Sequence, residues 1–515
     1  MNPTVNLSAS ISLQGVRKFN EIFEKSVDGF LGIRYATAER FCRPKPFTLK
    51  GKHSVVTYGK VAPQRLADVA KLYFPLKIPG VESISEDCLY LNVWRPSDIS
   101  HGEQLPVMVW FHGGSFTQGL SNIFVGDAIC CVNRVLLVSC NYRLGFLGNA
   151  CSHDGYLEGN YGFLDQLEAL EWVKRHIESF GGDKNNVTIF GESAGGMSVS
   201  LHLVSELSKG LFHKAICQSG AAYGRHLIWN RSQASNLLLS KAKRIGYKGT
   251  RNGQELKEFL NSLSYNDIVN MLPGNSALNG IIDGRFLKAY PLDIINENPS
   301  NIPLMTGCTN DEGSLFIMPF LKNYVVEDER HYCSILDTII RKMFFRGYSE
   351  SVLNRLIDRI KEVYSKNEES YEKRLSRFYS DVVFVVPSYN LATRHQEHAI
   401  VYQYELHYRP SFSIFPPWTE CIHGFDIPFV FGEPFLGRIS YEWPKNEQNL
   451  SIEIMKAWGE FAKTGKLKEE KTFREGHIKV WNDGKTYTSV FQNDIINFWN
   501  NEAKEILRND SRSKL

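Results

Sequence analysis

One serine stands in a glycine-rich segment, Gly-Glu-Ser-Ala-Gly-Gly, that directly follows a run of β-branched and aromatic residues. The run, 187–190, predicts a buried strand, and the residues from Gly196 to Val204 are compatible with a helix. The glycines permit a cramped strand-to-helix turn that raises the hydroxyl of Ser193 above a sheet. This context favours an α/β fold with a nucleophilic serine; an ordinary glycine-rich turn is the alternative.

Other short apolar runs alternate along the chain with longer amphipathic segments. Segments 164–177 and 452–462 place apolar residues at helical spacing. Strands that alternate with helices predict a large, mostly parallel central sheet with helices on both faces. The charged, helical patterns of 230–270 and 330–380 predict helices inserted over the sheet edge. The remaining predicted strands are 107–111, 135–140, 214–217 and 303–307.

The composition allows one large hydrophobic core. The chain has 515 residues, 43% of them hydrophobic, and no linker-like or low-complexity stretch divides it. We therefore expect a single domain over residues 1–505 and a short tail, 506–515. The net charge of +3 argues against a nucleic-acid-binding protein. No apolar run is long enough for a transmembrane segment, and no cysteine and histidine spacing predicts a metal site, so we expect no cofactor.

A serine nucleophile needs a histidine base and an acid that orients it, in the chain order serine, acid, histidine for this kind of fold. Glu312 follows the predicted strand 303–307 and so stands at the carboxyl end of the sheet, where ligands bind. His423 lies in a loop beside a glycine. On the residues alone, Asp311 and Asp426 are rivals of Glu312 for the role of the acid.

Segment 110–116, Trp-Phe-His-Gly-Gly-Ser-Phe, follows the strongest of the predicted strands. Its glycines let the main chain approach a substrate, so that backbone N–H groups can stabilise the negative charge of a reaction intermediate. Ala194, directly after the serine, supplies a further N–H group. A simple β-turn is the alternative.

These residues resemble the type-B carboxylesterase/cholinesterase family over nearly the whole chain. The resemblance implies an α/β-hydrolase fold whose inserted helices form an active-site gorge. It implies a triad of Ser193, Glu312 and His423, with glutamate as the acid. Blocks that carry the resemblance are 85–92, 141–145, 159–166, 180–183, 191–196, 311–313 and 423–424.

The resemblance implies that the backbone N–H groups of Gly114, Ser115 and Ala194 form the oxyanion hole. Ser115 stands where the family motif has a third glycine, and we expect its side chain to crowd a bulky alcohol group. Cholinesterases have a choline-binding tryptophan where this chain has Ile78. The chain is therefore similar to the carboxylesterases rather than to the cholinesterases.

Two structural ion pairs of the family map to Arg40 with Glu86 and to Arg143 with Asp165, and we expect both pairs to be buried. Secreted relatives pair the cysteine that matches Cys88 with one just before a Pro-Gln, where this chain has alanine. No cysteine between 218 and 307 can form the family's second disulfide. The chain therefore does not require an oxidising compartment.

The last three residues, Ser513, Lys514 and Leu515, match a peroxisomal import signal, and residues 1–16 lack the basic and apolar regions of a secretion signal. Together with the missing disulfide partners, this predicts a peroxisomal protein that binds the import receptor. A cytoplasmic protein is the alternative.

The predicted reaction is hydrolysis of a small carboxylic ester through an acyl-enzyme, with His423 as the base for Ser193. The same triad also serves acyl transfer to an alcohol or amine and cleavage of a thioester. A non-catalytic binding module of the same fold is the third possibility, but such a module would lack part of the triad. The sequence predicts neither the physiological substrate nor the oligomeric state.

Overall fold

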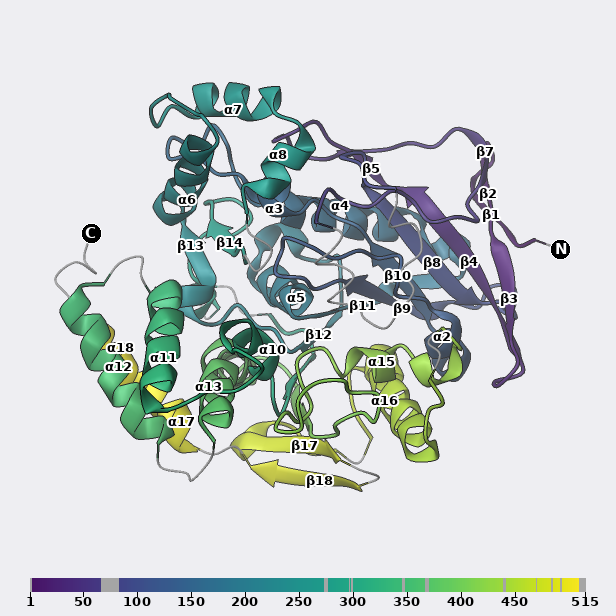
Figure 1. Ribbon diagram of the computed structural model, residues 1–515. Helices are drawn as coiled ribbons and strands as arrows, with labels where there is room; N and C mark the ends of the chain where they lie inside the picture. Colours follow the sequence, from purple (N-terminus) through teal and green to yellow (C-terminus); the bar gives the residue numbers. More distant parts are fainter. Residues whose placement is uncertain are drawn as a thin grey trace.

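The computed structural model describes residues 2–65, 83–272, 277–295, 297, 300–344, 348–365, 370–438, 441–468, 470–482, 485–490 and 493–508. Its centre is an eleven-stranded sheet (Figure 1). In spatial order, the strands are β18 (Lys485–Val490), β17 (His477–Asn482), β16 (Val401–Leu406), β15 (Leu304–Thr309), β12 (Lys214–Gln218), β11 (Gly182–Glu192), β9 (Leu105–Phe111), β10 (Leu136–Cys140), β8 (Tyr90–Pro96), β4 (Lys25–Arg34) and β3 (Val16–Asn20).

The sheet is parallel in its centre and antiparallel at its edges. The seven strands from β17 to β10 are parallel to their neighbours. The pairs β17–β18, β10–β8, β8–β4 and β4–β3 are antiparallel. This confirms the predicted large, mostly parallel sheet, to which the structure adds the antiparallel edges.

Both faces of the central strands are buried. Successive residues of a strand point to opposite faces, so Val107 and Val109 of β9 belong to one core whereas Met108 and Trp110 belong to the other. A strand that is covered on both faces has few positions for polar side chains. This explains why the central strands appear in the sequence as continuous apolar runs.

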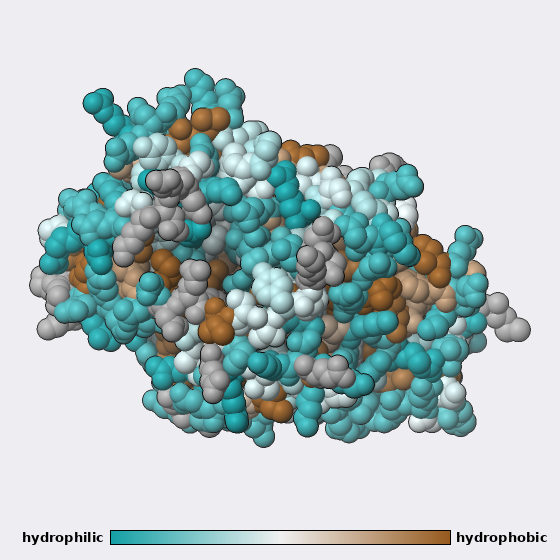
Figure 2. All heavy atoms as spheres, turned by 90° about the horizontal axis from the view of Figure 1, so that it is seen from below, coloured by the Kyte–Doolittle hydropathy of each residue, from teal (hydrophilic) through white to brown (hydrophobic). Residues whose placement is uncertain are grey.

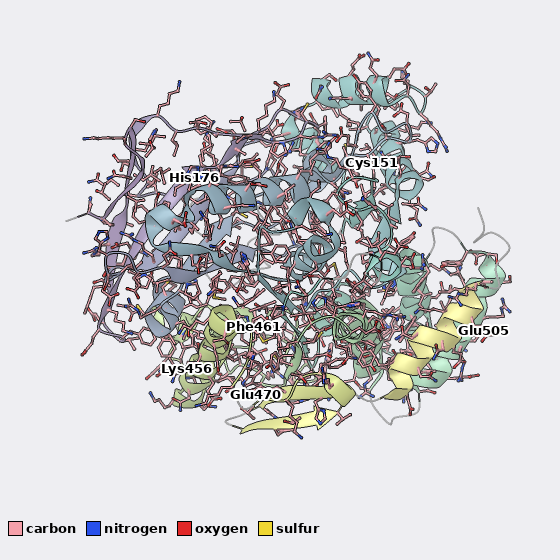
Figure 3. All side chains as sticks on the ribbon, turned by 180° about the vertical axis from the view of Figure 1, so that it is seen from behind. Cys151, His176, Lys456, Phe461, Glu470 and Glu505 are labelled. Carbon is pink, nitrogen blue, oxygen red and sulfur yellow. The ribbon has the colours of Figure 1, made fainter. Side chains whose placement is uncertain are left out.

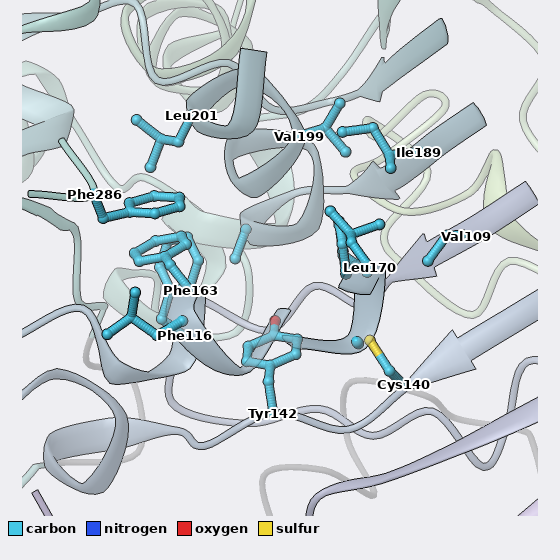
Figure 4. Packing of buried hydrophobic residues seen from close by; sticks show 14 of the residues in the cluster. Val109, Phe116, Cys140, Tyr142, Phe163, Leu170, Ile189, Val199, Leu201 and Phe286 are labelled. Atoms are coloured by element: carbon cyan, nitrogen blue, oxygen red, sulfur yellow. The ribbon is translucent and has the colours of Figure 1, made fainter. Parts of the chain in front are cut away.

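Helices cover the two faces. On one face lie α4 (Tyr161–His176) and α5 (Ala194–Val204); Figure 4 shows Leu170 and Val199 of these helices near Val109 and Ile189 of the sheet. On the other face, α16 (Lys445–Thr464) packs on β9 and β11 and contacts α2 (Asp127–Asn133). The predicted helices 164–177 and 452–462 are therefore confirmed.

Two groups of helices are inserted between strands, as the charged segments predict. Those after β15 share a core with the C-terminal helices, so that α12 lies beside α18 (Figure 1). Figure 3 shows α16, with Lys456 and Phe461, well apart from α18, with Glu505. The inserted helices are α6 (Arg231–Arg244), α7 (Gly253–Ser262) and α8 (Tyr265–Asn270) after β12, and α11 (Glu329–Phe344), α12 (Glu350–Tyr364) and α13 (Tyr371–Ser380) after β15. The C-terminal helices are α17 (Asn493–Asn497) and α18 (Ala503–Arg508), which follow β18.

Both predicted ion pairs form, but only one of them is buried. Arg143 donates two hydrogen bonds to Asp165, at 2.8 and 2.7 Å, with both side chains buried. Arg40 binds Glu86 in the same bidentate way, but these side chains are 19% and 31% exposed, so the expected burial of this pair is wrong. Arg40 also donates to the carbonyl of Leu263 at 2.7 Å and so fastens the end of α7 to this part of the fold.

All ten cysteines carry free thiols, and eight of them are buried. The two that are partly exposed are Cys42 and Cys333. Figure 2 shows a largely hydrophilic surface with separate apolar areas. Within the described ranges, no helix is long and apolar enough to cross a bilayer. Ile78 and the C-terminal Ser513, Lys514 and Leu515 lie outside the described residues.

Candidate active site

Ser193 lies at the junction of β11 and α5, in the backbone conformation that a sharp turn requires. Its φ of 58° and ψ of −124° are rare for a residue with a side chain. A Cβ atom on Gly195 would overlap the carbonyl oxygen of Phe111, and one on Gly191 would lie 2.5 Å from the carbonyl carbon of Gly195. Both glycines are therefore needed, because the turn packs directly against the end of β9.

Glu312 and His423, which are 111 positions apart in the sequence, meet at the carboxyl end of the sheet. One carboxylate oxygen of Glu312 contacts Nδ1 of His423, and the other accepts a hydrogen bond of 2.6 Å from the N–H group of Thr309. Glu312 is fully buried and His423 almost so. This arrangement fixes both the position and the tautomer of the imidazole.

The two rival carboxylates contact other groups. Asp426 accepts a hydrogen bond of 2.7 Å from the amide of Gln218. Asp311 accepts hydrogen bonds from the hydroxyl of Ser314 at 2.5 Å and from the N–H group of Glu420 at 2.7 Å. Of the three acids that the sequence left open, the structure brings Glu312 to Nδ1 of His423.

The second imidazole nitrogen faces a carboxylate that the sequence analysis did not single out. Nε2 of His423 lies 3.1 Å from Oε1 of Glu192, the residue just before Ser193. Within the described residues, the Ser193 hydroxyl makes no hydrogen bond. Catalytic hydrogen bonds are often long without substrate and tighten only when it binds. The only sequence signal for Glu192 was its place inside the serine motif.

Buried carboxylates set the electrostatics of the imidazole. Burial by itself lowers the pKa of His423, but the charges of Glu192 and Glu312 outweigh burial and raise this pKa above the ordinary value. Burial also raises the pKa of Glu192, an effect that His423 opposes, and raises the pKa of Asp426 to about 6. The site therefore favours the imidazolium that forms when histidine accepts a proton.

Aromatic side chains enclose the imidazole. Phe316, in α10 (Ser314–Ile317), lies with its ring centre 5.0 Å from that of His423. The ring centre of Phe384, in the π-helical segment Asp381–Val385, lies 4.6 Å from that of His423. Tyr379 stacks on Phe316 at 5.0 Å. These rings limit both the rotation of the imidazole and the access of water to it.

The segment after β9 lies against the serine. A Cβ atom on Gly113 would be only 3.0 Å from Cβ of Ser193. Gly114 and Ser115 have φ values of 107° and 56°, and the carbonyl of Gly114 accepts the N–H groups of residues 117 and 118 at 3.0 Å. In the described part of the chain, the N–H groups of Gly114 and Ser115 donate no hydrogen bond. Ala194 begins α5, where a backbone N–H group has no partner within the helix.

A buried histidine supports this segment from behind. Tyr142 donates a hydrogen bond of 2.6 Å to the carbonyl of His112, and the two rings stack at 4.3 Å. Burial lowers the pKa of His112 to about 4, so the ring is neutral at physiological pH. His112 was predicted only as part of the loop, because nothing local to it predicts a partner 30 positions away.

A pocket lies beside this loop rather than at the serine. Its lining includes Gln118, Leu144, Ile268 and Leu272. Among the described residues, no group of three histidine, cysteine, aspartate or glutamate side chains could hold a metal ion. The groups that surround the Ser193 hydroxyl are an imidazole, carboxylates and backbone N–H groups.

Comparison with known proteins gives one consistent result. Residues 2–501 match the model of the carboxylesterase family. The cocaine esterase of Oryctolagus cuniculus is 33% identical over 457 residues, 85% of this chain and 84% of that protein. Carboxylesterase 5A of Canis lupus familiaris is 34% identical over 85% of this chain and 78% of its own length. An acylcarnitine hydrolase of Mus musculus is 32% identical over 75% of this chain and 69% of its own length.

Proposed function

The chain belongs to the carboxylesterase family and is a carboxylic-ester hydrolase, and on this premise we propose that Ser193 is its nucleophile, with His423 as base and Glu312 as the orienting acid. The observation that carries the assignment is the contact of Glu312 with Nδ1 of His423, next to a serine held in a strained turn. A strained backbone at the end of a parallel strand is typical of a nucleophile presented to substrate.

The proposed reaction begins when the Ser193 hydroxyl attacks the ester carbonyl and His423 accepts its proton. The backbone N–H groups of Gly114, Ser115 and Ala194 then stabilise the oxyanion, which is supported by their position beside the serine and by the absence of other acceptors for the first two in the described residues. Proton return from the imidazole releases the alcohol. Water, activated by the same imidazole, then hydrolyses the acyl-enzyme.

In the structure, Nε2 of His423 faces Oε1 of Glu192 at 3.1 Å, so the imidazole turns towards the Ser193 hydroxyl before this reaction. Both carboxylates contribute to the imidazolium, but by different routes. Glu312 holds the ring through Nδ1, since its second oxygen is fixed by the N–H group of Thr309. Glu192 acts by charge alone, because its Oε1 accepts no hydrogen bond in the described residues.

The assignment is tested by comparing Ser193→Ala with a matched serine of the same helix. Ser198 is buried in α5 and donates to the carbonyl of Ala194 at 2.9 Å. With p-nitrophenyl acyl esters, we expect Ser193→Ala to lower kcat at least about 10⁴-fold, and Ser198→Ala to retain a rate within about tenfold of the wild type. Equal rates for Ser193→Ala and the wild type would refute the mechanism.

The same machinery supports acyl transfer and thioester cleavage, so the substrate needs its own experiment. Similarity to proteins named cocaine esterase and acylcarnitine hydrolase supports small-molecule esters of carboxylic acids. A panel of acyl esters, acylcarnitines and acyl-CoA thioesters, assayed with and without an acceptor alcohol, separates the three reactions. Free acid as the product in the presence of the acceptor identifies a hydrolase; a new ester identifies a transferase.

We also propose that Ser513, Lys514 and Leu515 direct the chain to peroxisomes through the import receptor. The proposal rests on the residues alone, since they match a signal that a receptor reads. A fluorescent protein that carries residues 506–515 at its C-terminus should enter peroxisomes, and the same fusion without Leu515 should stay in the cytoplasm. Cytoplasmic fluorescence from both fusions would favour the cytoplasmic alternative.

A further inference from the structure

The loops that carry Glu312 and His423 are tied together by the residue just before Glu312. Oδ2 of Asp311 accepts the hydrogen bond of 2.7 Å from the N–H group of Glu420, which lies three positions before the histidine. The N–H group of Asp311 donates in turn to the carbonyl of Cys421 at 3.1 Å. Asp311 thus binds the histidine loop through both its side chain and its backbone.

A second residue strengthens the same junction. Oδ1 of Asn310 accepts from the N–H group of Cys421 at 3.1 Å, and its amide donates to the carboxylate of Glu420 at 2.5 Å. Lys373, in α13, reaches the other oxygen of that carboxylate at 3.1 Å. The backbones of Asp311 and Ile422 form an isolated parallel bridge. These contacts set the two loops side by side, with Glu312 and His423 immediately beyond the bridge.

The other oxygen of Asp311 anchors the acid loop to α13. Oδ1 accepts hydrogen bonds from the hydroxyls of Ser314, at 2.5 Å, and of Ser376. The N–H group of Gly313 donates to the hydroxyl of Ser380 at 2.7 Å, and a Cβ atom on Gly313 would overlap the carbonyl oxygen of Ser376. Three segments that are distant in sequence therefore meet at one carboxylate.

We propose that Asp311 is a positioning residue, whose carboxylate holds the acid loop, the histidine loop and α13 in register so that Glu312 keeps the imidazole of His423 oriented. This inference rests on the proposed function of Ser193, Glu312 and His423. Asp311 contacts neither the imidazole nor the serine, and its side chain is 8% exposed, so it acts only through the loops that it joins.

The test compares Asp311→Ala with Asp311→Asn at the level of each working active site, counted by titration with a covalent serine-directed inhibitor. Asp311→Ala should lower kcat about 10- to 100-fold, because a displacement near 1 Å in the triad has an effect of this size. KM should stay within about threefold, since no substrate contact is lost. The acid limb of the pH profile, where kcat/KM falls as His423 becomes protonated, should move to lower pH. The reason is that a displaced Glu312 stabilises the imidazolium less and so lowers the pKa of His423.

Asp311→Asn should recover most of the rate. Asparagine keeps one acceptor for the N–H group of Glu420, and its amide can donate to the hydroxyls of Ser314 and Ser376, which then act as acceptors. We expect its kcat within about fivefold of the wild type, the equivalent of about one net hydrogen bond. A rate as low as that of Asp311→Ala would overturn the account of Asp311 as a hydrogen-bonding clamp.

Glu372, in the helix α13 that Asp311 contacts, offers a matched control. It is also 8% exposed, and it accepts a hydrogen bond of 2.6 Å from the N–H group of Val326, away from both catalytic loops. Glu372→Gln should lower Tm but leave kcat per titrated site and the acid limb unchanged. If Asp311→Ala behaves like Glu372→Gln, its role is only structural and the inference is wrong.

A milder variant keeps the test informative if Asp311→Ala does not fold. Ser376→Ala removes one hydrogen bond from Asp311 and should lower kcat about fivefold, with a shift of the acid limb in the same direction. A wild-type acid limb and rate in Ser376→Ala would contradict the inference. Ser193→Ala distinguishes failure of the proposed triad from failure of this inference. Wild-type activity in Ser193→Ala refutes the triad, whereas wild-type kcat and pH dependence in the Asp311 variants refute only the positioning role of Asp311.

Discussion

Replacement of Glu192 by glutamine removes one negative charge from beside the imidazole while keeping the side chain's size. Oε1 of Glu192 lies 3.1 Å from Nε2 of His423. At this distance two unit charges attract by about 1.3 kcal/mol at the dielectric constant of water, and by about 5 kcal/mol at an effective value of 20. Both groups are buried, so the value of 20 is the starting point; because burial raises the pKa of Glu192, its carboxylate is charged for only part of the time, which reduces the average attraction to about 1–2 kcal/mol.

About 1.4 kcal/mol corresponds to one pKa unit, so we expect the pKa of His423 to fall by about one unit in Glu192→Gln. Histidine must be neutral to accept the serine proton, and activity is therefore lost as the pH falls through its pKa. A lower pKa moves the acid limb of kcat/KM to lower pH, so that the variant stays active in more acidic buffer than the wild type.

The assay is the initial rate of ester hydrolysis at substrate concentrations well below KM, measured from about pH 5 to pH 10, because, despite burial, Glu192 and Glu312 raise the pKa of His423 to about 9. Glu447→Gln is the control, since Glu447 is a buried carboxylate whose hydrogen bonds go to Tyr408 and Ser411 rather than to the imidazole. The control should keep the wild-type limb. An acid limb that is unchanged or moves to higher pH in Glu192→Gln would show that Glu192 does not support the imidazolium.

Three other substitutions test separate parts of the structure. Ser115→Gly should raise kcat/KM for esters of branched alcohols relative to ethyl esters, and an unchanged ratio would remove the support for crowding by this side chain. Gly195→Ala should yield no folded protein by near-ultraviolet circular dichroism, because its Cβ would overlap the Phe111 carbonyl; a native spectrum would contradict this packing. Arg143→Ala should lower the free energy of unfolding in urea by about 3–5 kcal/mol, since it leaves Asp165 buried without its partner. A loss below about 1 kcal/mol would mean that Asp165 is neutral in the folded protein.

The strands that the sequence predicted are the five neighbours at the centre of the sheet, from β15 to β10. The strand at 107–111 was predicted from its apolar run, and β9 extends it only to Leu105. The edge strands β3 and β18 were not predicted, because a strand with one open face shows no continuous apolar run. The helices after β12 and β15 were predicted from charge and spacing, but neither pattern specifies the shared core of α12 and α18.

The same distinction applies to the site. The turn around Ser193 was predictable because its glycines and its strand are adjacent in the sequence. The residues alone left Glu312, Asp311 and Asp426 open, and only the family resemblance predicted Glu312, since the choice depends on which carboxylate reaches an imidazole more than 100 positions away. The contact of Glu192 with Nε2 of His423 was missed for the same reason, because the two residues are more than 200 positions apart in the sequence.

The free thiols allow local and global unfolding of this protein to be followed by chemical labelling. A thiol-reactive dye has access to Cys42 and Cys333 in the folded chain, whereas the other eight sulfur atoms become reactive only where the surrounding structure loosens. Cys421 lies in the histidine loop and Cys140 in the central sheet. The order in which these sulfur atoms are labelled as denaturant rises therefore distinguishes a catalytic loop that detaches on its own from a sheet that melts as a whole.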